Sequence, residues 1–354
     1  MSKALQLARR GRYTADPNPC VGCVLVRNGA IIGHGWHVRA GQAHAEINAL
    51  ADAGDARDAT AYVTLEPCSH VGRTGPCCDA LIAAGVTRVV VAMQDPNPLV
   101  SGQGLWRLAA AGIEVTCGVL GDDAAALNAG FIKRMRTGRP LLTSKLAMSL
   151  DGRTAMASGE SRWITSAAAR QDVHRLRAAS SAVLIGINTV LADDPALTAR
   201  LDEDIEQPVR VVLDSALQMP VQAKMAGLPG KTLILTGSTD PAKRERLQQA
   251  GFDVHRLDVA EDQRLKLEHV LDFLGRQQLN SVLVEAGPVL NGALLEKRLV
   301  DRWIVYAAPC IMGDAARGLF HVPGMQAMAD RIQLRLLDVR QVGPDLRLEF
   351  IIEN

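Results

Sequence analysis

The chain has 354 residues, of which 48% are apolar and 22% charged, and its 39 Lys and Arg against 38 Asp and Glu leave a formal charge of +1. These proportions are those of a globular protein and exclude a disordered or low-complexity chain, while a balanced charge excludes a general attraction to nucleic acid or anionic membranes. No apolar run reaches the roughly 18 to 20 residues of a membrane span, and Met1–Arg12 lacks the apolar centre of an export signal. We therefore expect a cytoplasmic protein of two domains, since one domain takes about 150 residues.

Short apolar strands alternate with helical stretches in the first part of the chain. A hairpin is predicted for residues 21–26 and 30–33, because Asn28-Gly29 between them is a strong turn signal. Such an alternation predicts a sheet with helices on its faces. The remaining elements are expected as a helix at 43–53, a strand at 61–65, a helix at 78–84, a strand at 88–93, a helix at 105–111, a strand at 113–117 and a helix at 122–135.

A polar, turn-forming segment at residues 136–140 precedes the apolar run 141–146 and predicts the boundary between domains 1–138 and 139–354. The second part alternates again, so we expect two α/β domains. Its strands are predicted at 182–187, 209–214, 232–236, 254–257 and 281–285, its helices at 166–178, 241–250 and 265–276, and two closing strands at 333–340 and 345–352.

Seven cysteines, an odd number, argue against a disulfide framework. Five of them lie before residue 80, which indicates a metal site or reactive thiols in the N-terminal part. Cys117 and Cys310 are interpreted as small buried apolar residues. The five clustered thiols are those of Cys20, Cys23, Cys68, Cys77 and Cys78.

A possible zinc site is formed by His44, Cys68 and Cys77. His44-Ala45-Glu46 opens a predicted helix, Glu66-Pro67-Cys68 ends a strand, and Cys77 follows after eight intervening residues. One imidazole and two thiolates make three protein ligands and leave a tetrahedral position for water, and thiolates favour zinc over magnesium. Glu46 could then carry a proton from the water to a departing amine. The order His-x-Glu, then Pro-Cys and a second Cys, is that of zinc nucleobase deaminases, although the cysteine spacing here is longer.

Two other interpretations of this pattern stay open. The residues could coincide by chance, or they could form a closed structural zinc site with His70 or Cys78 as the fourth ligand. A structural site would have no use for Glu46. Because Cys78 directly follows Cys77, the choice between the two thiolates also stays open.

The second part carries weaker signals. No Gly-x-Gly-x-x-Gly follows a strand, but glycine turns at Gly186 and Gly287 each follow a predicted strand and could present backbone N–H groups to a phosphate. Each turn taken alone is more often without a ligand. Arg177 could grip a phosphate in a bidentate manner or be a solvated helix residue. Lys145 lies within an apolar strand, so it either reaches the edge of the domain or is held in a site.

Several segments of the first part resemble the deaminase half of the RibD family of bifunctional riboflavin biosynthesis enzymes, in which the cysteine pair is also spaced by eight residues. The resemblance implies a cytidine-deaminase-like α/β/α fold, one zinc ion per chain on His44, Cys68 and Cys77, Glu46 as proton shuttle, and Asn18 as a substrate contact. Gly75 departs from the proline that the family commonly has. The matching segments are Pro17-Asn18-Pro19, Val21-Gly22, His44-Ala45-Glu46, residues 64–70, Gly72-Arg73-Thr74, Cys77, residues 95–98 and Ser101-Gly102.

The second part resembles the reductase half of the same family, which has a dihydrofolate-reductase-like α/β fold, through residues 145–153, 163–166, 191–195 and 284–288. The resemblance implies NADPH as cofactor and gives Lys145 a place where it could polarise or protonate a sugar oxygen. The implied cofactor contacts are Ala147, Trp163, Thr189, Asp193, Ser215, Gly287, Pro288, Val289, Leu290, Asn291, Gly292 and Ala293. The implied substrate contacts are Ser161, Arg177, Leu197, Arg200 and Glu285.

The family implies two reactions on a phosphorylated pyrimidine. The first is hydrolytic deamination of 2,5-diamino-6-ribosylamino-4(3H)-pyrimidinone 5′-phosphate, and the second is NADPH-dependent reduction of the ribosyl group of the aminouracil product to ribityl. The resemblance also favours a homo-oligomer that binds neither nucleic acid nor membrane. Two other classes remain: a nucleic-acid deaminase, which the scarce aromatic residues (3%) disfavour, and a non-catalytic binding module stabilised by zinc.

Overall fold

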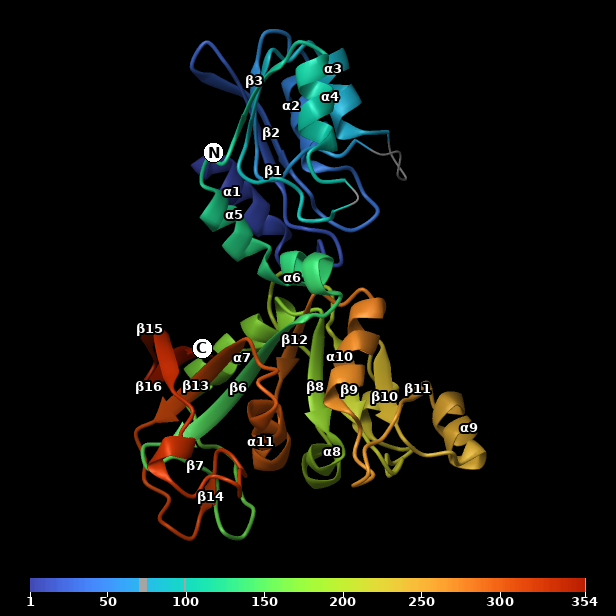
Figure 1. Ribbon diagram of the computed structural model, residues 1–354, viewed down its shortest axis with the longest axis vertical. Helices are drawn as coiled ribbons and strands as arrows, with labels where there is room; N and C mark the ends of the chain where they lie inside the picture. The colour runs from blue at the N-terminus through green and yellow to red at the C-terminus, as the bar shows by residue number, and fades with distance from the viewer. Residues whose placement is uncertain (70–74, 99, 354) are drawn as a thin grey trace. The chain divides into compact units, whose positions relative to one another are not determined.

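The chain divides into two units, Met1–Arg139 and Pro140–Asn354, in a computed structural model that describes residues 1–69, 75–98 and 100–353 (Figure 1). This division falls one residue after the boundary expected from the sequence. No helix in these ranges is long and apolar enough to cross a membrane. The segment Gly72-Arg73-Thr74 and His70 lie outside the described residues, as do Val71, Leu99 and Asn354.

The first unit is built on a five-stranded sheet in the order β2-β1-β3-β4-β5. The predicted hairpin is confirmed: β1 (Gly22–Arg27) and β2 (Ala30–Trp36) pair antiparallel, and Asn28 and Gly29 turn between them with φ of 53° and 79°. The strands β3 (Thr60–Val63), β4 (Arg88–Val91) and β5 (Glu114–Cys117) run parallel to one another.

Helices cover both faces of this sheet (Figure 1). The apolar side chains of α2 (Ala45–Ala53) and α3 (Cys77–Ala83) pack into one core with the strands, together with Leu108 of α4 (Gln103–Ala110). On the other face, α1 (Ser2–Ala8), which continues into the 3₁₀ turn η1 (Arg9–Gly11), packs against Val24 of β1. The expected sheet with helices on its faces is therefore present.

The helix expected at 122–135 is wrong in one respect, because the structure has two helices there. The first, α5 (Gly121–Leu127), ends at Asn128, where φ of −111° and ψ of 22° leave the helical conformation, and α6 (Ala129–Thr137) follows. The Asn128 amide instead binds the backbone of Cys20, accepting from its N–H at 2.8 Å and donating to its C=O at 3.0 Å. This pair of hydrogen bonds spans 108 residues of sequence, so no local pattern reveals it.

The second unit is built on a nine-stranded sheet in the order β11-β10-β9-β8-β12-β6-β13-β16-β15. Its strands from β11 to β13 are parallel, and β16 and β15 add antiparallel at one edge. The strands are β6 (Leu141–Ser149), β8 (Ala182–Gly186), β9 (Val209–Leu213), β10 (Thr232–Thr236), β11 (Asp253–Arg256), β12 (Ser281–Val284), β13 (Arg302–Ala308), β15 (Leu334–Val342) and β16 (Asp345–Ile352).

Two helical layers enclose this sheet. On one face α10 (Leu267–Arg276) and α11 (Pro288–Glu296) bury Leu, Val and Phe side chains against the strands. On the other face lie α7 (Ala167–Ala178), α8 (Ile187–Asp193) and α9 (Pro241–Gln249). Smaller elements are the paired strands β7 (Arg153–Ala155) and β14 (Arg317–Gly318) and the 3₁₀ turns η2 (Lys224–Gly227) and η3 (Met328–Asp330).

The sequence did not predict β13, although this strand lies inside the sheet, between β6 and β16. Its residues Trp303, Ile304, Val305 and Tyr306 are all buried. A strand buried on both faces gives a continuous apolar run without alternation, and such a run does not distinguish a strand from a buried helix.

Candidate functional sites

Three side chains from three different elements meet to form the candidate metal centre. His44 caps α2, Cys77 opens α3 and Cys68 lies in the loop between β3 and α3. Their ligand atoms all lie within 4.8 Å of one another: His44 Nδ1 is 3.2 Å from Cys77 Sγ and 3.6 Å from Cys68 Sγ. One imidazole and two thiol groups converging in this way fit zinc. The Cys77 thiol, together with the His44 ring and the Cys77 N–H, lowers the pKa of Cys68 to about 4.

Cys78 lies outside this centre. Its thiol donates to the carbonyl groups of Pro67 at 3.2 Å and Gly104 at 3.6 Å, and burial raises its pKa to about 12. The Cys77 thiol, and not that of Cys78, therefore lies with the ligand atoms of His44 and Cys68. Cys117 and Cys310 are exposed, so the interpretation of these two as buried residues is wrong.

Glu46 lies beside the candidate metal centre. It occupies the first turn of α2, its side chain is hydrogen-bonded with the Cys77 thiol, and only 3% of its surface is exposed. Burial raises its pKa to about 7. A carboxyl group with such a pKa can both accept and release a proton near neutral pH, which is the property of a general acid–base group.

A buried carboxylate holds the loop that carries Cys68, and the sequence interpretation missed it. Glu66 accepts four backbone N–H groups with its two oxygens: those of Asp95 (3.0 Å), Gly102 (3.0 Å), Gly104 (2.8 Å) and Leu105 (3.3 Å). Glu66 therefore ties the segment between β4 and α4, and the start of α4 itself, to the chain that leads from β3 to Cys68.

Arg107 of α4 makes a second link between the ligand-bearing segments, also missed. Its guanidinium donates to the Ser69 carbonyl at 3.0 Å and pairs with Asp79 at 2.7 Å. Ser69 follows Cys68 in the chain, and Asp79 lies in the first turn of the helix that Cys77 opens. The Arg107 side chain thus contacts a residue close in sequence to each of the two cysteines, Cys68 and Cys77.

Asn18 is connected to the metal centre through a histidine. Its amide nitrogen lies 3.0 Å from His37 Nε2, and His37 Nδ1 lies 3.1 Å from the Ala43 carbonyl. Burial lowers the pKa of His37, so its ring is neutral, donates through Nδ1 and accepts from Asn18 through Nε2. The His37 ring packs edge-on against His44 with 5.4 Å between centroids. The sequence interpretation named Asn18 and overlooked His37.

In the second unit, Lys145, Arg177 and Glu285 form a charged cluster in which each side chain is partly buried. Arg177 on α7 binds the Glu285 carboxylate with Nε at 2.5 Å and Nη2 at 3.0 Å, and Lys145 on β6 approaches it at 3.7 Å. Burial alone would raise the pKa of Glu285, but Arg177 and Lys145 outweigh it and lower that pKa to about 2. Arg200 lies close by, bonded to His174 at 2.9 Å.

The expected cofactor contacts gather at the carboxyl ends of parallel strands, where open α/β sheets bind their ligands. Ala147 lies in β6, Thr189 in the helix after β8, Ser215 directly after β9 and Gly287 shortly after β12. The Ser215 hydroxyl accepts the N–H of Leu265 at 3.2 Å.

Residues 287–293 form the start of α11. Asn291 is fully buried, and its amide joins Ser144 and the Ala286 carbonyl at 2.7 Å each. A Cβ on Gly292 would lie 2.1 Å from the His321 carbonyl, so this position admits only glycine. The hydrogen bonds of Asn291 and the close approach of the His321 carbonyl to Gly292 therefore constrain the backbone of this segment. Pro288 is the first residue of the helix, and Val289, Leu290 and Ala293 follow in it.

The remaining expected contacts lie in the segment before α7 and at or after the end of α8. Trp163 is 70% exposed, with the Arg170 guanidinium 4.6 Å from its ring centre. Asp193 at the end of α8 pairs with Arg162 at 3.0 Å. Leu197 is buried with a positive φ of 53°, and Ser161 is half-buried in the segment before α7.

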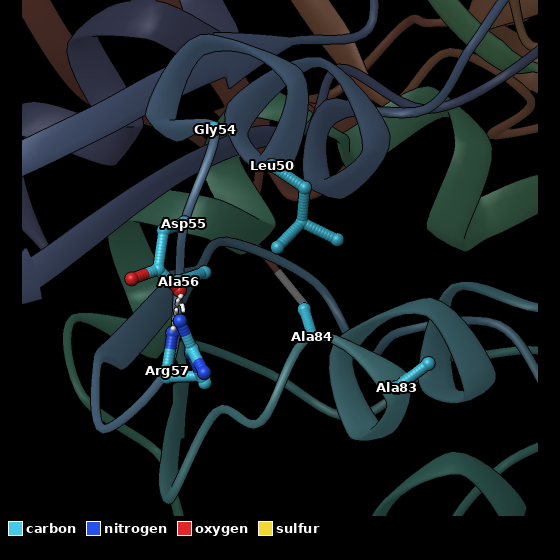
Figure 2. A pocket seen from close by; sticks show the side chains of 7 residues that line it. All are labelled: Leu50, Gly54, Asp55, Ala56, Arg57, Ala83 and Ala84. Atoms are coloured by element: carbon cyan, nitrogen blue, oxygen red, sulfur yellow. Dashed lines mark hydrogen bonds and ion pairs between the residues drawn. The ribbon is translucent and has the colours of Figure 1, made fainter.

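One open pocket of about 370 Å³ contains none of the expected site residues. Figure 2 shows it between the end of α2 and the end of α3, with Leu50 directed toward it and the Arg57 side chain bonded to Asp55 at 3.1 Å. Its other lining residues are Gly54, Ala56, Ala83 and Ala84.

Both units match described families. The description "RibD C-terminal domain" matches residues 140–348, and "Cytidine and deoxycytidylate deaminase zinc-binding region" matches residues 1–93. The chain is 52% identical to the riboflavin biosynthesis protein RibD of Escherichia coli, covering 99% of this chain and 98% of that protein, and 49% identical to that of Haemophilus influenzae, covering 99% and 96%.

Solved structures agree with these matches. The structure of Acinetobacter baumannii RibD is similar over 100% of this chain and 98% of its own, with a TM-score of 0.93 and 46% identity. A Thermotoga maritima structure with a TM-score of 0.87 and 33% identity covers 99% and 97%, and is described as a diaminohydroxyphosphoribosylaminopyrimidine deaminase/5-amino-6-(5-phosphoribosylamino)uracil reductase.

Proposed function

The chain belongs to the RibD family of riboflavin biosynthesis proteins, and from that premise we propose which of its residues carry out its two reactions. The protein is a bifunctional enzyme with a zinc-dependent deaminase domain and an NADPH-dependent reductase domain, so the expected family and fold class are confirmed. We assign the deaminase to residues 1–138 and the reductase to residues 139–354.

The deaminase acts on 2,5-diamino-6-ribosylamino-4(3H)-pyrimidinone 5′-phosphate. His44, Cys68 and Cys77 hold the zinc ion, which when bound lowers the pKa of water toward neutrality. Glu46 takes a proton from the attacking water and delivers it to the 2-amino nitrogen, ammonia leaves, and the ring carbon keeps the oxygen. Asn18, oriented by His37, provides a hydrogen-bonding group for the pyrimidine. The observation that carries this assignment is the buried Glu46 carboxyl group next to three converging ligands.

The reductase acts on the aminouracil product, 5-amino-6-(5-phosphoribosylamino)uracil. Ala147, Trp163, Thr189, Asp193, Ser215 and residues 287–293 would hold NADPH, which when bound would supply the hydride for reduction at the sugar C1′. Lys145 donates a proton to the sugar oxygen as the ring opens to ribityl. Glu285 keeps Lys145 and Arg177 in place through the 3.7 Å and 2.5 Å contacts. Ser161, Arg177, Leu197 and Arg200 surround the phosphorylated sugar.

Further proposals concern partners and location. The strand β15 ends the sheet, with one side of its backbone unpaired by any other strand among the described residues and with Leu334, Leu336, Leu337 and Val339 exposed. An apolar edge strand of this kind supports a homo-oligomer, because a second copy would cover it. We also propose that the enzyme is cytoplasmic and that its substrates are small phosphorylated pyrimidines. We further propose that it binds no nucleic acid, and a gel-shift assay with RNA tests this.

The test of the proposed function combines both reactions. Purified, zinc-loaded protein is mixed with the diaminopyrimidine ribotide and NADPH, and ammonia and nicotinamide absorbance are followed together. We expect ammonia first and NADPH oxidation after it. Ammonia release without NADPH oxidation would contradict the reductase assignment. The absence of both ammonia release and NADPH oxidation would indicate a structural zinc site.

A further inference from the structure

His174 lies in the reductase unit beside the charged cluster, although nothing in its sequence context marks it. It sits on α7 three residues before Arg177, so both side chains project from the same side of the helix. Its ring is buried, with 9% of the residue exposed, and its Nε2 atom lies 2.9 Å from Nη2 of Arg200.

The direction of this hydrogen bond is fixed by chemistry. An arginine side chain has five N–H donors and no acceptor, so the bond requires a lone pair on His174 Nε2 and therefore a neutral ring. Burial, together with Arg200 and Arg177, lowers the pKa of His174 to about 4, which keeps the ring neutral at neutral pH. A protonated ring would instead lose the bond and place a third positive charge next to two guanidinium groups.

Thr198 connects the same two arginines. Arg177 Nη1 donates to the Thr198 carbonyl at 3.0 Å, and Arg200 Nη1 donates to the Thr198 hydroxyl at 3.4 Å. The two guanidinium groups nevertheless differ in charge balance. Arg177 is neutralised by Glu285, whereas the partners of Arg200 in the described part of the chain, His174 and Thr198, are neutral. The positive charge of Arg200 is therefore left for an anion from outside the chain.

We propose that His174 is a positioning residue of the reductase site: its Nε2 atom accepts a hydrogen bond from Arg200 and so fixes that guanidinium, next to Arg177, to receive the substrate phosphate. The inference rests on the proposed reductase function and names a residue that acts through another. Charged hydrogen bonds to phosphate depend on the direction of the N–H donors. An arginine whose guanidinium is already held by a neighbouring side chain therefore loses less rotamer freedom when it binds phosphate. The Nε2 lone pair of His174, which accepts the hydrogen bond from Arg200, is not free to accept a proton at the same time.

Three substitutions separate this role from simple packing. The Oε1 atom of glutamine lies as many bonds from Cβ as Nε2 of histidine does, whereas Oδ1 of asparagine falls one bond short. His174→Gln therefore keeps an acceptor for Arg200, and His174→Asn and His174→Leu remove it. Since hydrogen bonds to charged groups are strong, we expect His174→Asn and His174→Leu to raise KM for the aminouracil ribotide roughly tenfold. His174→Gln should stay within about twofold of the parent, with kcat and KM for NADPH unchanged in all three.

A binding measurement without turnover accompanies the kinetics. Inorganic phosphate, titrated by ³¹P NMR, should bind the parent and His174→Gln alike and His174→Leu more weakly, by a factor similar to the change in KM. His269→Leu is the matched control, since His269 lies on α10 and pairs with the exposed Asp258. It should change neither quantity.

Three results would overturn the proposal: equal losses in His174→Gln and His174→Asn, a fall in kcat with KM unchanged, or phosphate binding indifferent to His174→Leu. Failure of the proposed function looks different. In that case the parent enzyme would not oxidise NADPH with the aminouracil ribotide, while the phosphate titration would still report on His174 and Arg200.

Discussion

The two units each bury a glutamate in their candidate site, and the two carboxyl groups are in opposite electrostatic situations. Glu46 has no arginine or lysine among the groups that shift its pKa, and burial raises that pKa to about 7. Glu285 is held between Arg177 and Lys145, and its pKa is lowered to about 2 in spite of burial. The same side chain is therefore suited to carrying a proton in one unit and to remaining a fixed anion in the other, because the surroundings and not the residue type set its pKa.

Replacing the proton carrier should have the largest effect. Glu46→Gln keeps size and polarity but cannot carry a proton, so ammonia release should fall by about 10² to 10⁴, the range of a general acid–base group. Zinc content should stay at the parent level, because the three ligands are intact, and reduction of supplied aminouracil ribotide should persist. Loss of both activities in a folded, zinc-loaded variant would show that the two sites are not independent.

Replacing Glu285, the fixed anion, should lower the stability of the reductase unit. Glu285→Gln leaves Arg177 and Lys145 without their counter-charge, so the free energy of unfolding of the reductase unit should drop by about 3 kcal/mol, as found when one partner of a buried pair is removed. Urea unfolding measures this. A drop well below 1 kcal/mol would mean that the two cations are balanced by other groups.

The same substitution gives a pH signature. The folded pKa of Glu285, about 2, lies below the ordinary value of 4.5 for a glutamate, so its contribution to stability is complete above pH 4.5 and is lost as the pH falls toward 2. The stability difference between the parent and Glu285→Gln should therefore shrink over that window. A difference that stays constant between pH 5 and 2 would contradict the lowered pKa.

A third buried carboxylate sharpens the contrast, because within the described part of the chain Glu66 is bound by four backbone N–H groups and by no cation. In Glu66→Gln an amide NH₂ would face N–H donors, so at least one donor loses its acceptor. We expect a loss of about 2 kcal/mol in the stability of the deaminase unit. Glu114→Gln, at the more exposed Arg88 pair, is the matched control and should change stability little.

Arg107 should show the smallest effect. Arg107→Met keeps much of the side-chain volume but removes the links to Ser69 and Asp79, so both thiol ligands become less well oriented. Substitutions in the shell behind metal ligands weaken metal binding by 10- to 100-fold, and we expect about the lower limit here because Arg107 is partly exposed. Competition with a chromophoric chelator measures zinc affinity. An unchanged affinity would mean that the ligands are positioned without Arg107.

The features that the sequence predicted correctly depend on local spacing. Asn28-Gly29 predicts a hairpin because both residues tolerate positive φ. His44, Cys68 and Cys77 lie at the ends of predicted strands and helices, and the structure brings their ligand atoms within 4.8 Å of one another. Sequence spacing alone is therefore sufficient to find a candidate residue that lies at the end of a strand or helix with a clear sequence pattern.

The residues that the sequence did not reveal act over long distances. Asn128 breaks a helix to bind Cys20, 108 residues away, and His174 was overlooked because Arg200 lies 26 residues further on. His37 and Glu66 similarly find partners that only the folded chain brings near. A buried polar side chain looks the same in sequence as a solvated one, so only its partners identify its role.

The position of β6 has a consequence for how the protein is synthesised. This strand opens the reductase unit, yet its two neighbours in the sheet, β12 and β13, begin at Ser281 and Arg302. A ribosome must therefore translate more than a hundred further residues before β6 can pair, whereas every strand of the deaminase unit finds its neighbours before residue 118. We expect the deaminase unit to fold while the rest emerges and the reductase unit to remain open until late, a stage at which chaperones would meet it.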